Sequence, residues 1–270
     1  MNKDHFSKQS YSDNELFEKV NEEVLKWAVD KKMEIETLKK LEKFRREFLG
    51  NVSHELKTPI TNIQGYVLTL LEGGIDEDEI NKKYLTRTEK NINRMIEIVN
   101  DLEEITKLET GELKLHFSNF DMVQLTKEVI DILELKKLEA NVEISFAEQY
   151  SQIFVNADRE NIKKVLTNLI ENSIKYSKPE LGKTKISFLD MDKYILTEIT
   201  DNGIGIEEAN IPRLFERFFR VDKARTLNTG GSGLGLAIVK HIIEAHHQTI
   251  NVRSTIGIGS TFAFTLKKGM

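Results

Sequence analysis

Apolar residues recur at helical spacing along the first hundred residues of the chain. Residues 13–71 contain one proline and, besides Gly50 and Gly65, no glycine, so this stretch is predicted to be nearly continuous helix. Its early apolar positions lie at intervals of three, four or multiples of seven: Phe17, Val20, Val24, Trp27, Leu38 and Leu41. This spacing favours a two-stranded coiled coil, whereas the charged Lys31 and Glu34 in its seam leave a solvated single helix as the alternative.

A second helix is predicted between two breaks in the pattern. Gly73-Gly74 ends the first helix, residues 76–79 supply acidic groups for the start of the next, and Thr110-Gly111 ends that one as a hinge. The apolar stripe of the second helix consists of Ile92, Met95, Ile96, Val99, Leu102 and Ile105. Since a hairpin of two amphipathic helices buries little apolar surface, we expect it to pair with a second copy into a dimeric four-helix bundle.

The hydrophobic pattern changes after residue 112. Alternation typical of strands is found at residues 113–117, 142–146, 185–189 and 194–200 and near Ile250 and Phe262. Helical spacing is found at residues 122–138, 159–176 and 234–245. Helices and strands in this order favour an α/β sandwich with a mixed, mostly antiparallel sheet. The chain is therefore predicted to be α+β, with the hairpin first and the sandwich second.

Composition narrows the class of protein. With 270 residues, of which 39% are hydrophobic and 31% charged, the chain can bury one sizeable core and also carry long charged helices. A net charge of -5 without a basic block argues against a nucleic-acid partner. The absence of cysteine excludes disulfides, thiol catalysis and cysteine-bound metal. No apolar run reaches membrane-spanning length and the first residues are no signal peptide, so we expect a soluble segment without membrane contact.

The segment Ser53-His54-Glu55-Leu56-Lys57-Thr58-Pro59 carries candidate chemistry. Apolar residues on both sides follow helical spacing and leave His54 beside the packed stripe, where it can meet solvent. Glu55 can accept the proton of one ring nitrogen and leave the other unprotonated, as a nucleophilic imidazole requires. Thr58, one helical turn further, could orient a water molecule, and Pro59 is expected to bend the helix. Taken alone, a histidine at such a position is more often an ordinary surface residue.

A second candidate site begins on the predicted helix at residues 159–176. Asn168, Asn172 and Lys175 share one face of this helix, although asparagine is a poor interior helix former. A neutral amide oxygen suits a magnesium ion that phosphates already neutralise. Two ordinary surface asparagines remain the alternative interpretation.

Two glycine-containing motifs follow. In Asp201-Asn202-Gly203-Ile204-Gly205, the carboxylate could accept the exocyclic amine of adenine while the glycines let the backbone approach a planar ligand, although Asp-Asn-Gly is also a common turn sequence. In residues 230–240, glycines lead directly into an apolar helix whose N-H groups and positive end suit phosphates. A glycine run alone is weak evidence, and the strand that a dinucleotide fold would need before it is missing.

These three motifs, with Phe215, Phe218 and Phe219 between the last two, resemble the ATP-binding domain shared by gyrases, chaperones, histidine kinases and mismatch-repair proteins. Joined to the His54 segment, the resemblance is to the sensor histidine kinases of two-component systems and covers about residues 44–266. Residues 42–48 and 241–246 are similar to the cytoplasmic part of phosphate-regulon-type sensors.

The resemblance implies a role for each matching residue. His54 would receive the γ-phosphoryl group of ATP, Glu55 would be its acid/base partner, and Thr58 would assist dephosphorylation of a partner aspartate. The nucleotide would be bound by Asn168, Asn172, Lys175, Tyr176, Asp201, Gly203, Gly205, Arg220, Gly231, Gly233, Leu234 and Gly235.

Within that set, Asn172 would hold Mg²⁺, Asn168 and Lys175 would lie near the phosphates, and Tyr176 would lie against adenine. Asp201, Gly203 and Gly205 would form the adenine floor, and Gly231, Gly233 and Gly235 would anchor a lid at residues 217–229. Arg220 is the candidate for charge stabilisation at the γ-phosphate and Arg225 is its rival.

The implied domains are a signalling coiled-coil helix at residues 1–40, a dimerisation and phosphotransfer hairpin at 41–110 and a catalytic ATP-binding domain at 111–270. The implied protein is a homodimeric, cytoplasmic protein-histidine kinase, with room for a membrane sensor upstream. It would use ATP and Mg²⁺, pass the phosphoryl group to an aspartate of a response-regulator receiver domain, and act as a phosphatase as well.

Two other functions stay open, a conformational ATPase and a non-catalytic dimeric scaffold. Chaperone members of the superfamily carry a water-activating glutamate where this chain has Asn168, and an amide cannot take up a proton. His247-Gln248 departs from the two glycines that kinases of this family more often have there. His241, His246 and His247 lack the spacing of a metal pair and, like His116, are expected to be structural.

Overall fold

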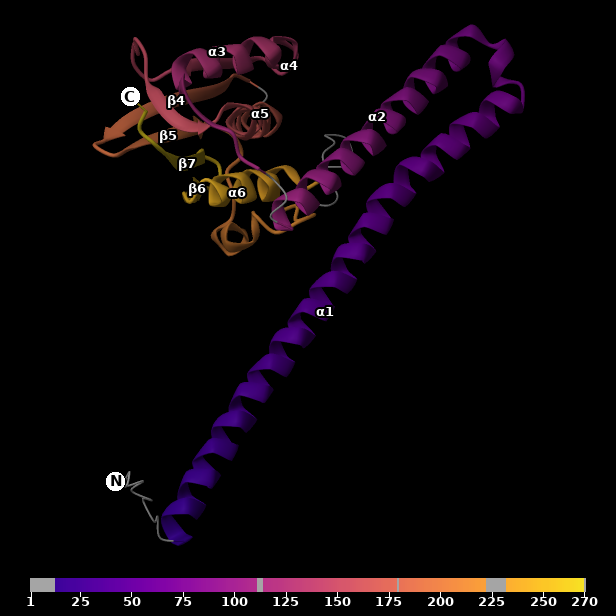
Figure 1. The fold of residues 1–270 in the computed structure, drawn as a ribbon. Coiled ribbons are helices and arrows are strands. Elements are labelled where there is room, and N and C mark those ends of the chain that lie inside the picture. Colours follow the sequence, from indigo (N-terminus) through magenta and orange to yellow (C-terminus); the bar gives the residue numbers. More distant parts are fainter. Residues whose placement is uncertain (1–12, 111–113, 179, 222–231, 270) are drawn as a thin grey trace. The chain divides into compact units, whose positions relative to one another are not determined.

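The computed structural model describes residues 13–110, 114–178, 180–221 and 232–269 (Figure 1). Helix α1 spans Asp13–Leu71 and runs uninterrupted through Pro59. A turn containing the short helix η1 (Gly74–Asp76) leads to α2 (Asp78–Glu109), and Gly73 there has a φ of 116° that favours glycine. The predicted helical hairpin and its glycine break are confirmed.

The chain divides into two compact units after His54. In the first unit, the side chains of α1 described between residues 20 and 43 are all exposed, and Phe17 and Trp27 are 81% and 64% exposed. The helix is therefore confirmed, whereas its pairing into a coiled coil remains a prediction. The domain boundaries after residues 40 and 110 also remain predictions.

The second unit contains the rest of α1, α2 and a layered α/β fold. Five strands form one sheet in the order β2 (Val142–Phe146), β4 (Gly182–Met191), β5 (Tyr194–Asp201), β7 (Gly259–Lys267) and β6 (Ile250–Thr255). The pair β2 and β4 is parallel and the other pairs are antiparallel, which confirms the predicted mixed sheet. A separate antiparallel pair joins β1 (Phe117–Asp121) to β3 (Phe154–Asp158).

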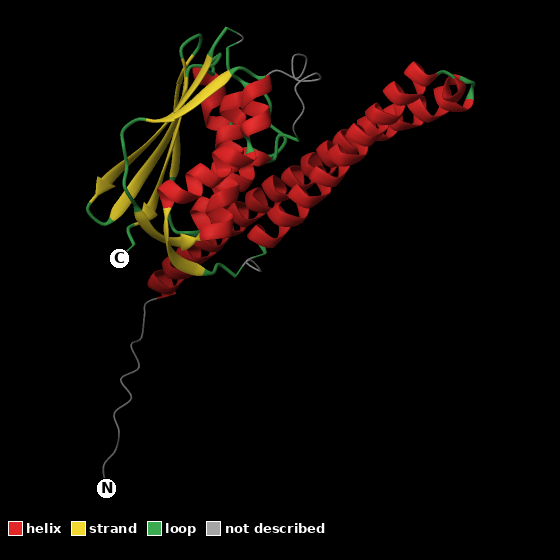
Figure 2. Cartoon of the chain, turned by 90° about the horizontal axis from the view of Figure 1, so that it is seen from above, coloured by secondary structure: helices red, strands yellow, loops and turns green. Residues whose placement is uncertain are grey.

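The remaining helices are α3 (Met122–Ile132), α4 (Glu134–Glu139), α5 (Arg159–Lys175), η2 (Glu208–Arg213) and α6 (Gly235–Ala245). Figure 2 shows the longer of these helices covering one face of the sheet. The apolar stripe of α5 is fully buried at Ile162, Val165, Leu166, Leu169 and Ile170. Burying each such side chain contributes about 2 kcal/mol, so this stripe holds the polar face of α5 in a fixed orientation.

Three predicted element boundaries differ from the structure. The first strand begins at Phe117, residues 114–116 before it are not in a strand, and residue 113 lies outside the described residues. The helix predicted at 122–138 is two helices, α3 and α4, interrupted at the buried Leu133. Strand β3 was not predicted, because its inward residues Val155 and Ala157 are too small to give a clear apolar alternation.

Two aspartates cap the helices that follow β1 and β3. Asp121 accepts hydrogen bonds from the backbone N-H groups of Val123 and Ile153, both at 3.0 Å. Asp158 accepts from the backbone N-H groups of Asn161 at 3.0 Å and His116 at 2.8 Å. These bonds satisfy N-H groups at the starts of α3 and α5 and fix where α5 begins.

The histidines expected to be structural include one that is deeply buried. The Nε2 atom of His246 accepts a hydrogen bond from the backbone N-H of Asp158 at 3.0 Å, so Nδ1 carries the proton and donates to Ile242 O at 2.7 Å. Burial lowers the pKa of His246, which favours this neutral form. His247 follows with a φ of 57°, the left-handed conformation for which glycine is better suited. None of the described helices is long and apolar enough to cross a membrane.

Candidate functional site

The polar face of α5 meets the start of α6. A Cβ atom on Gly235 would lie 2.4 Å from Asn168 Oδ1, so a side chain at this position would displace the amide of Asn168. The amide nitrogen of Asn168 donates to Lys164 O at 3.1 Å, which leaves its oxygen facing α6. Asn172, one turn further, makes no side-chain hydrogen bond to another described residue. The amide of Asn172 therefore has no hydrogen-bond partner among the described residues. Its oxygen suits a cation that prefers oxygen ligands.

Two cations gather at the end of α5. Lys175 Nζ lies 5.0 Å from the centre of the Tyr176 ring. Burial, and after it the charge of Arg220, lowers the pKa of Lys175 to about 8. Burial likewise raises the pKa of Tyr176, so its hydroxyl stays protonated. A bound anion would relieve the repulsion between Lys175 and Arg220, which is the electrostatic character of a phosphate site.

Asp201 ends strand β5 and is half-buried. Its Oδ1 atom accepts hydrogen bonds from the backbone N-H groups of Gly203 at 2.8 Å and Ser260 at 3.2 Å. Burial raises the pKa of Asp201 despite these two bonds, which act in the opposite direction. The second oxygen, Oδ2, makes no hydrogen bond within the described part of the chain and can accept one from a ligand.

The loop after Asp201 packs tightly against the protein's own backbone. A Cβ atom on Gly203 would lie 2.4 Å from Tyr176 O, and the same carbonyl accepts a hydrogen bond from the backbone N-H of Ile204 at 3.2 Å. Gly205 has a φ of 69°, and a Cβ atom there would lie 2.1 Å from Thr255 O. Both glycines are thus required by contacts within the chain, whereas their predicted approach to a planar ligand stays a prediction.

The glycine motif before α6 is partly described. Gly233 has a φ of 74° and accepts a backbone hydrogen bond from Phe218 at 2.9 Å, and Phe218 itself has a φ of 61°. The left-handed conformation is strained for a phenylalanine, and strained residues of this kind gather at ligand sites. Leu234 is fully buried and secures the start of α6 in the core. Gly231, Arg225 and most of the predicted lid lie outside the described residues.

The His54 segment lies on α1 across the division between the two units. His54 and Thr58 are exposed, as a phosphoacceptor and a water-positioning residue require. In the second unit, Glu55 accepts a hydrogen bond from Arg94 Nη2 of α2 at 2.9 Å. The carboxylate predicted to be the acid/base partner is thus held by a cation.

Sequence reasoning missed Ser260 and Arg94. Ser260 comes from β7, and only the pairing register of β5 with β7, in which Thr200 lies opposite Thr261, brings it to Asp201. A signal for Arg94 did exist, because positions 55 and 94 are almost equally far from the glycine turn of the hairpin, at 18 residues from Gly73 and 20 from Gly74. Residues equidistant from such a turn lie side by side on the two helices.

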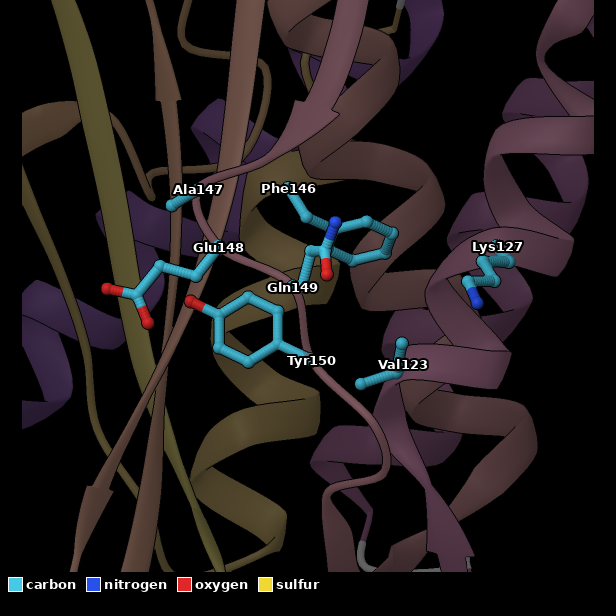
Figure 3. Close-up of a pocket in the computed structure, with 7 residues that line it drawn as sticks. All are labelled: Val123, Lys127, Phe146, Ala147, Glu148, Gln149 and Tyr150. Atoms are coloured by element: carbon cyan, nitrogen blue, oxygen red, sulfur yellow. The ribbon is translucent and has the colours of Figure 1, made fainter.

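A separate hollow of about 580 Å³ contains none of the nucleotide motifs. It lies between α3 and the loop after β2 and is lined by Val123, Lys127 and residues 146–150 (Figure 3). Tyr150 accepts a hydrogen bond from the backbone N-H of Phe188 at 3.1 Å, and the two rings pack edge to face with centres 5.1 Å apart. This tyrosine therefore has a structural role at the margin of the sheet, and the hollow is not the site predicted from the motifs.

Comparison with known proteins matches both parts of the chain. Residues 44–111 match the family model of the His Kinase A (phospho-acceptor) domain, and residues 157–270 match that of the histidine kinase-, DNA gyrase B- and HSP90-like ATPases. The sensor histidine kinase WalK of Bacillus subtilis is 38% identical over 229 residues, which cover 84% of this chain and 37% of WalK. The chain therefore spans little more than a third of that relative's length.

Solved structures give the same result. The catalytic domain of histidine kinase ThkA is 32% identical, with a TM-score of 0.50, over 57% of this chain and 99% of that domain. ThkA in complex with the response regulator protein TrrA is 30% identical, with a TM-score of 0.66, over 83% of this chain and 61% of ThkA. The likeness to phosphate-regulon-type sensors stays a prediction. With both family models matched in the predicted order and a catalytic domain matched over nearly its full length, the chain belongs to the sensor histidine kinases of two-component systems.

Proposed function

We propose that the chain is an ATP-dependent protein-histidine kinase that phosphorylates its own His54 and passes the phosphoryl group to an aspartate of a response-regulator receiver domain. The convergence of three separate motifs on one site carries this proposal. Gly235 lies against Asn168, and Gly203 lies against Tyr176. The cationic end of α5 and the Asp201 carboxylate therefore belong to one nucleotide site.

Adenine would be recognised by Asp201. The uncommitted Oδ2 of Asp201 can accept a hydrogen bond from the exocyclic amine of adenine, whereas guanine presents a carbonyl oxygen at the corresponding position. Tyr176, at the end of α5, would contact the base. Gly203 and Gly205 would form the floor below it.

The phosphates would lie along the polar face of α5 and the start of α6. Asn168, Lys175 and Arg220 would contact phosphate oxygens, and Gly231, Gly233, Leu234 and Gly235 would present the backbone at the start of α6. Asn172 fits a magnesium ligand because its amide has no partner among the described residues. Bound Mg²⁺ would neutralise phosphate charge, and no group of three histidine or carboxylate residues capable of holding a metal is found among the described residues.

The reaction follows from the residues next to His54. A ring nitrogen of His54 would attack the γ-phosphorus of ATP as the bond to the bridging oxygen breaks, and ADP would leave with that electron pair. Glu55 would take the proton from the other ring nitrogen. In a second step, the receiver aspartate would attack the phosphorus as its bond to the His54 nitrogen breaks, and Glu55 would return the proton to the ring, which restores the neutral imidazole.

We also propose the partners and the location. ThkA, the similar kinase described above, is bound to a response regulator in its complex, so the exposed surface around His54 and Thr58 would receive a receiver domain. The hairpin would form a homodimeric four-helix bundle, with domains at residues 1–40, 41–110 and 111–270. The segment would act in the cytoplasm without contacting a membrane.

Incubation of the full chain with γ-labelled ATP and Mg²⁺ tests the kinase activity. We expect a label that is lost in acid and kept in base, because a phosphoramidate has this stability. His54→Ala should lose the label and still bind ATP, since the nucleotide motifs lie in the other compact unit. An unlabelled protein, or an acid-stable label, would contradict the proposal, and ATP hydrolysis without label would favour a conformational ATPase.

The phosphatase activity is tested with the same protein and a cognate receiver domain. Thr58 lies one helical turn from His54, and its hydroxyl could orient water toward an aspartyl phosphate docked there. Thr58→Ala should keep most of the autophosphorylation and lose most of the dephosphorylation. An unchanged ratio of the two rates would make Thr58 a structural residue before Pro59.

A further inference from the structure

The ion pair between Arg94 and Glu55 joins the two helices of the hairpin. Its N-O distance is 2.9 Å, and the two side chains are only 26% and 19% exposed. By comparison, the pair of Lys43 and Glu47 on α1 is 78% and 61% exposed. A shielded ion pair keeps more of its interaction energy than a solvated one and holds Glu55 in one position.

The guanidinium of Arg94 has hydrogen-bonding capacity left over. Its Nε atom is buried and makes no hydrogen bond to another described residue. A buried donor without an acceptor costs free energy, so such a group usually marks a strained or ligand-binding arrangement. Arginine can bind a phosphate through two parallel N-H groups, which Nε and an Nη atom together provide.

Arg94 also lies near the predicted phosphate site. Lys175 has a pKa lowered to about 8, chiefly by burial and then by Arg220, and Arg94 adds to the lowering while Glu171 opposes it. The charges of Arg94 from α2 and Arg220 from the segment after η2 therefore both act on Lys175 of α5. Of these three, Arg94 is paired with the carboxylate that the kinase reaction needs as its base.

We propose that Arg94 is a phosphate-binding residue supplied by the hairpin, and that it exchanges its ion pair with Glu55 for the terminal phosphate of a bound nucleoside triphosphate. This inference rests on the proposed kinase function. While Arg94 holds Glu55, the carboxylate is bound to α2 through this ion pair. Transfer of Arg94 to the phosphate releases that carboxylate, so Glu55 can take the proton of the adjacent His54 when ATP is bound and not when ADP is bound.

Opposite effects of two substitutions test the exchange. ATP and ADP affinities are measured by calorimetry with Mg²⁺ on the full chain carrying His54→Ala, which prevents turnover. Arg94→Gln should weaken ATP binding about tenfold or more, because it removes a charge-assisted contact with the terminal phosphate, and should leave ADP binding nearly unchanged. Glu55→Gln should strengthen ATP binding and not ADP binding, since it removes the competing carboxylate.

The controls separate this exchange from a purely structural brace. Lys90→Gln, which removes an exposed cation one turn earlier on α2, should leave the ratio of ATP to ADP affinity unchanged. In the double variant of Arg94→Gln and Glu55→Gln, the gain from Glu55→Gln should disappear. If Arg94→Gln prevents folding, Glu55→Gln still tests the exchange. Glutamine at position 55 can keep the hydrogen bond from Arg94, so this variant is expected to fold.

Equal changes in ATP and ADP affinity would overturn the proposal, as would Glu55→Gln without a gain in ATP affinity. These results are distinguishable from failure of the kinase function itself. In that case the parent chain would bind no ATP or would acquire no acid-labile label. If the parent chain is labelled normally and Arg94→Gln does not change the ratio of ATP to ADP affinity, only the proposed exchange is contradicted.

Discussion

Asp201 has a structural role and, in the function proposed above, would also have a recognition role. One carboxylate oxygen is saturated by the backbone N-H groups of Gly203 and Ser260, which orients the other toward the proposed adenine site. An asparagine would have to keep its oxygen toward these donors and would then present its NH₂ group to the adenine amine. The position therefore requires an ionised carboxylate, and not merely a polar side chain.

Asp201→Asn should weaken ATP binding about tenfold or more and remove the preference for ATP over GTP. Because burial raises the pKa of Asp201, protonation should begin above the usual pH for an aspartate, so ATP affinity should fall as the solution is acidified through that range. Calorimetry with each nucleotide at several pH values measures both effects. The exposed Asp131→Asn serves as the control, and equal binding of ATP and GTP by the parent would exclude this adenine contact.

Residue identities within local motifs were predictable, and contacts between distant segments were not. Asn168 and Asn172 on α5 and Asp201 on β5 were singled out because each belongs to a short motif, and their roles stay predictions. Ser260 was missed because its contact with Asp201 depends on the register of β5 against β7. Arg94 was missed because its contact depends on how two helices are paired across a turn.

At the scale of elements, periodicity was reliable for long amphipathic segments. Apolar side chains recur at intervals of three and four residues along helices α1, α2, α5 and α6, where they are either buried or form an exposed stripe. All four helices were predicted. Strand β3 was missed because small inward residues give little hydrophobic contrast. The interruption between α3 and α4 at Leu133 was missed because Leu133 itself is apolar and buried, so it continues the pattern.

Helix α2 is linked to the start of α6 by a polar contact. Asp101 Oδ2 accepts a hydrogen bond from Ser232 Oγ at 2.9 Å. Burial raises the pKa of Asp101, and the negative charges of Glu104, Glu97 and Glu171 add to the rise, although the Ser232 bond opposes it. The ionised carboxylate is thus disfavoured in the folded protein.

Asp101→Asn should therefore stabilise the second unit at neutral pH by less than about 1 kcal/mol, since the site is partly exposed. A carboxyl whose pKa is higher when folded than when unfolded stabilises the fold below the unfolded pKa. That stabilisation is lost as the pH rises through the folded pKa. Urea midpoints at pH 7 and pH 4 should differ less in the variant than in the parent. Glu103→Gln, an equal charge change at an exposed site of α2, is the control, and an equal shift in both variants would contradict the argument.

At the scale of the whole molecule, the order of a helical hairpin and an α/β layer was predictable from where the hydrophobic period changes. The position of the division between the compact units was not, because α1 runs through it without a break in sequence pattern. The surroundings of the hairpin were not predictable either, because they depend on how the chain assembles with a second copy. An apolar groove lies along it, lined mainly by Ile60, Ile63, Ile92, Met95, Ile96 and Val99.

The uncovered groove predicts a dimer that one charge can disrupt. Ile60 and Ile96 are 48% and 52% exposed, a degree of apolar exposure along one stripe that a second hairpin would cover in a four-helix bundle. Ile96→Lys should convert a dimer into a monomer in light scattering, because burying a lysine without a partner at the centre of the bundle costs several kcal/mol.

Leu135→Lys is the matched control for this change. Leu135 lies on α4, outside the groove, and is 75% exposed, so the same apolar-to-lysine substitution should leave the dimer intact. A parent chain that is already monomeric at micromolar concentration would refute the bundle. Dissociation by both variants would show that the effect comes from added charge and not from the groove, whereas dissociation by Ile96→Lys alone identifies the stripe on α1 and α2 as the surface that joins two copies.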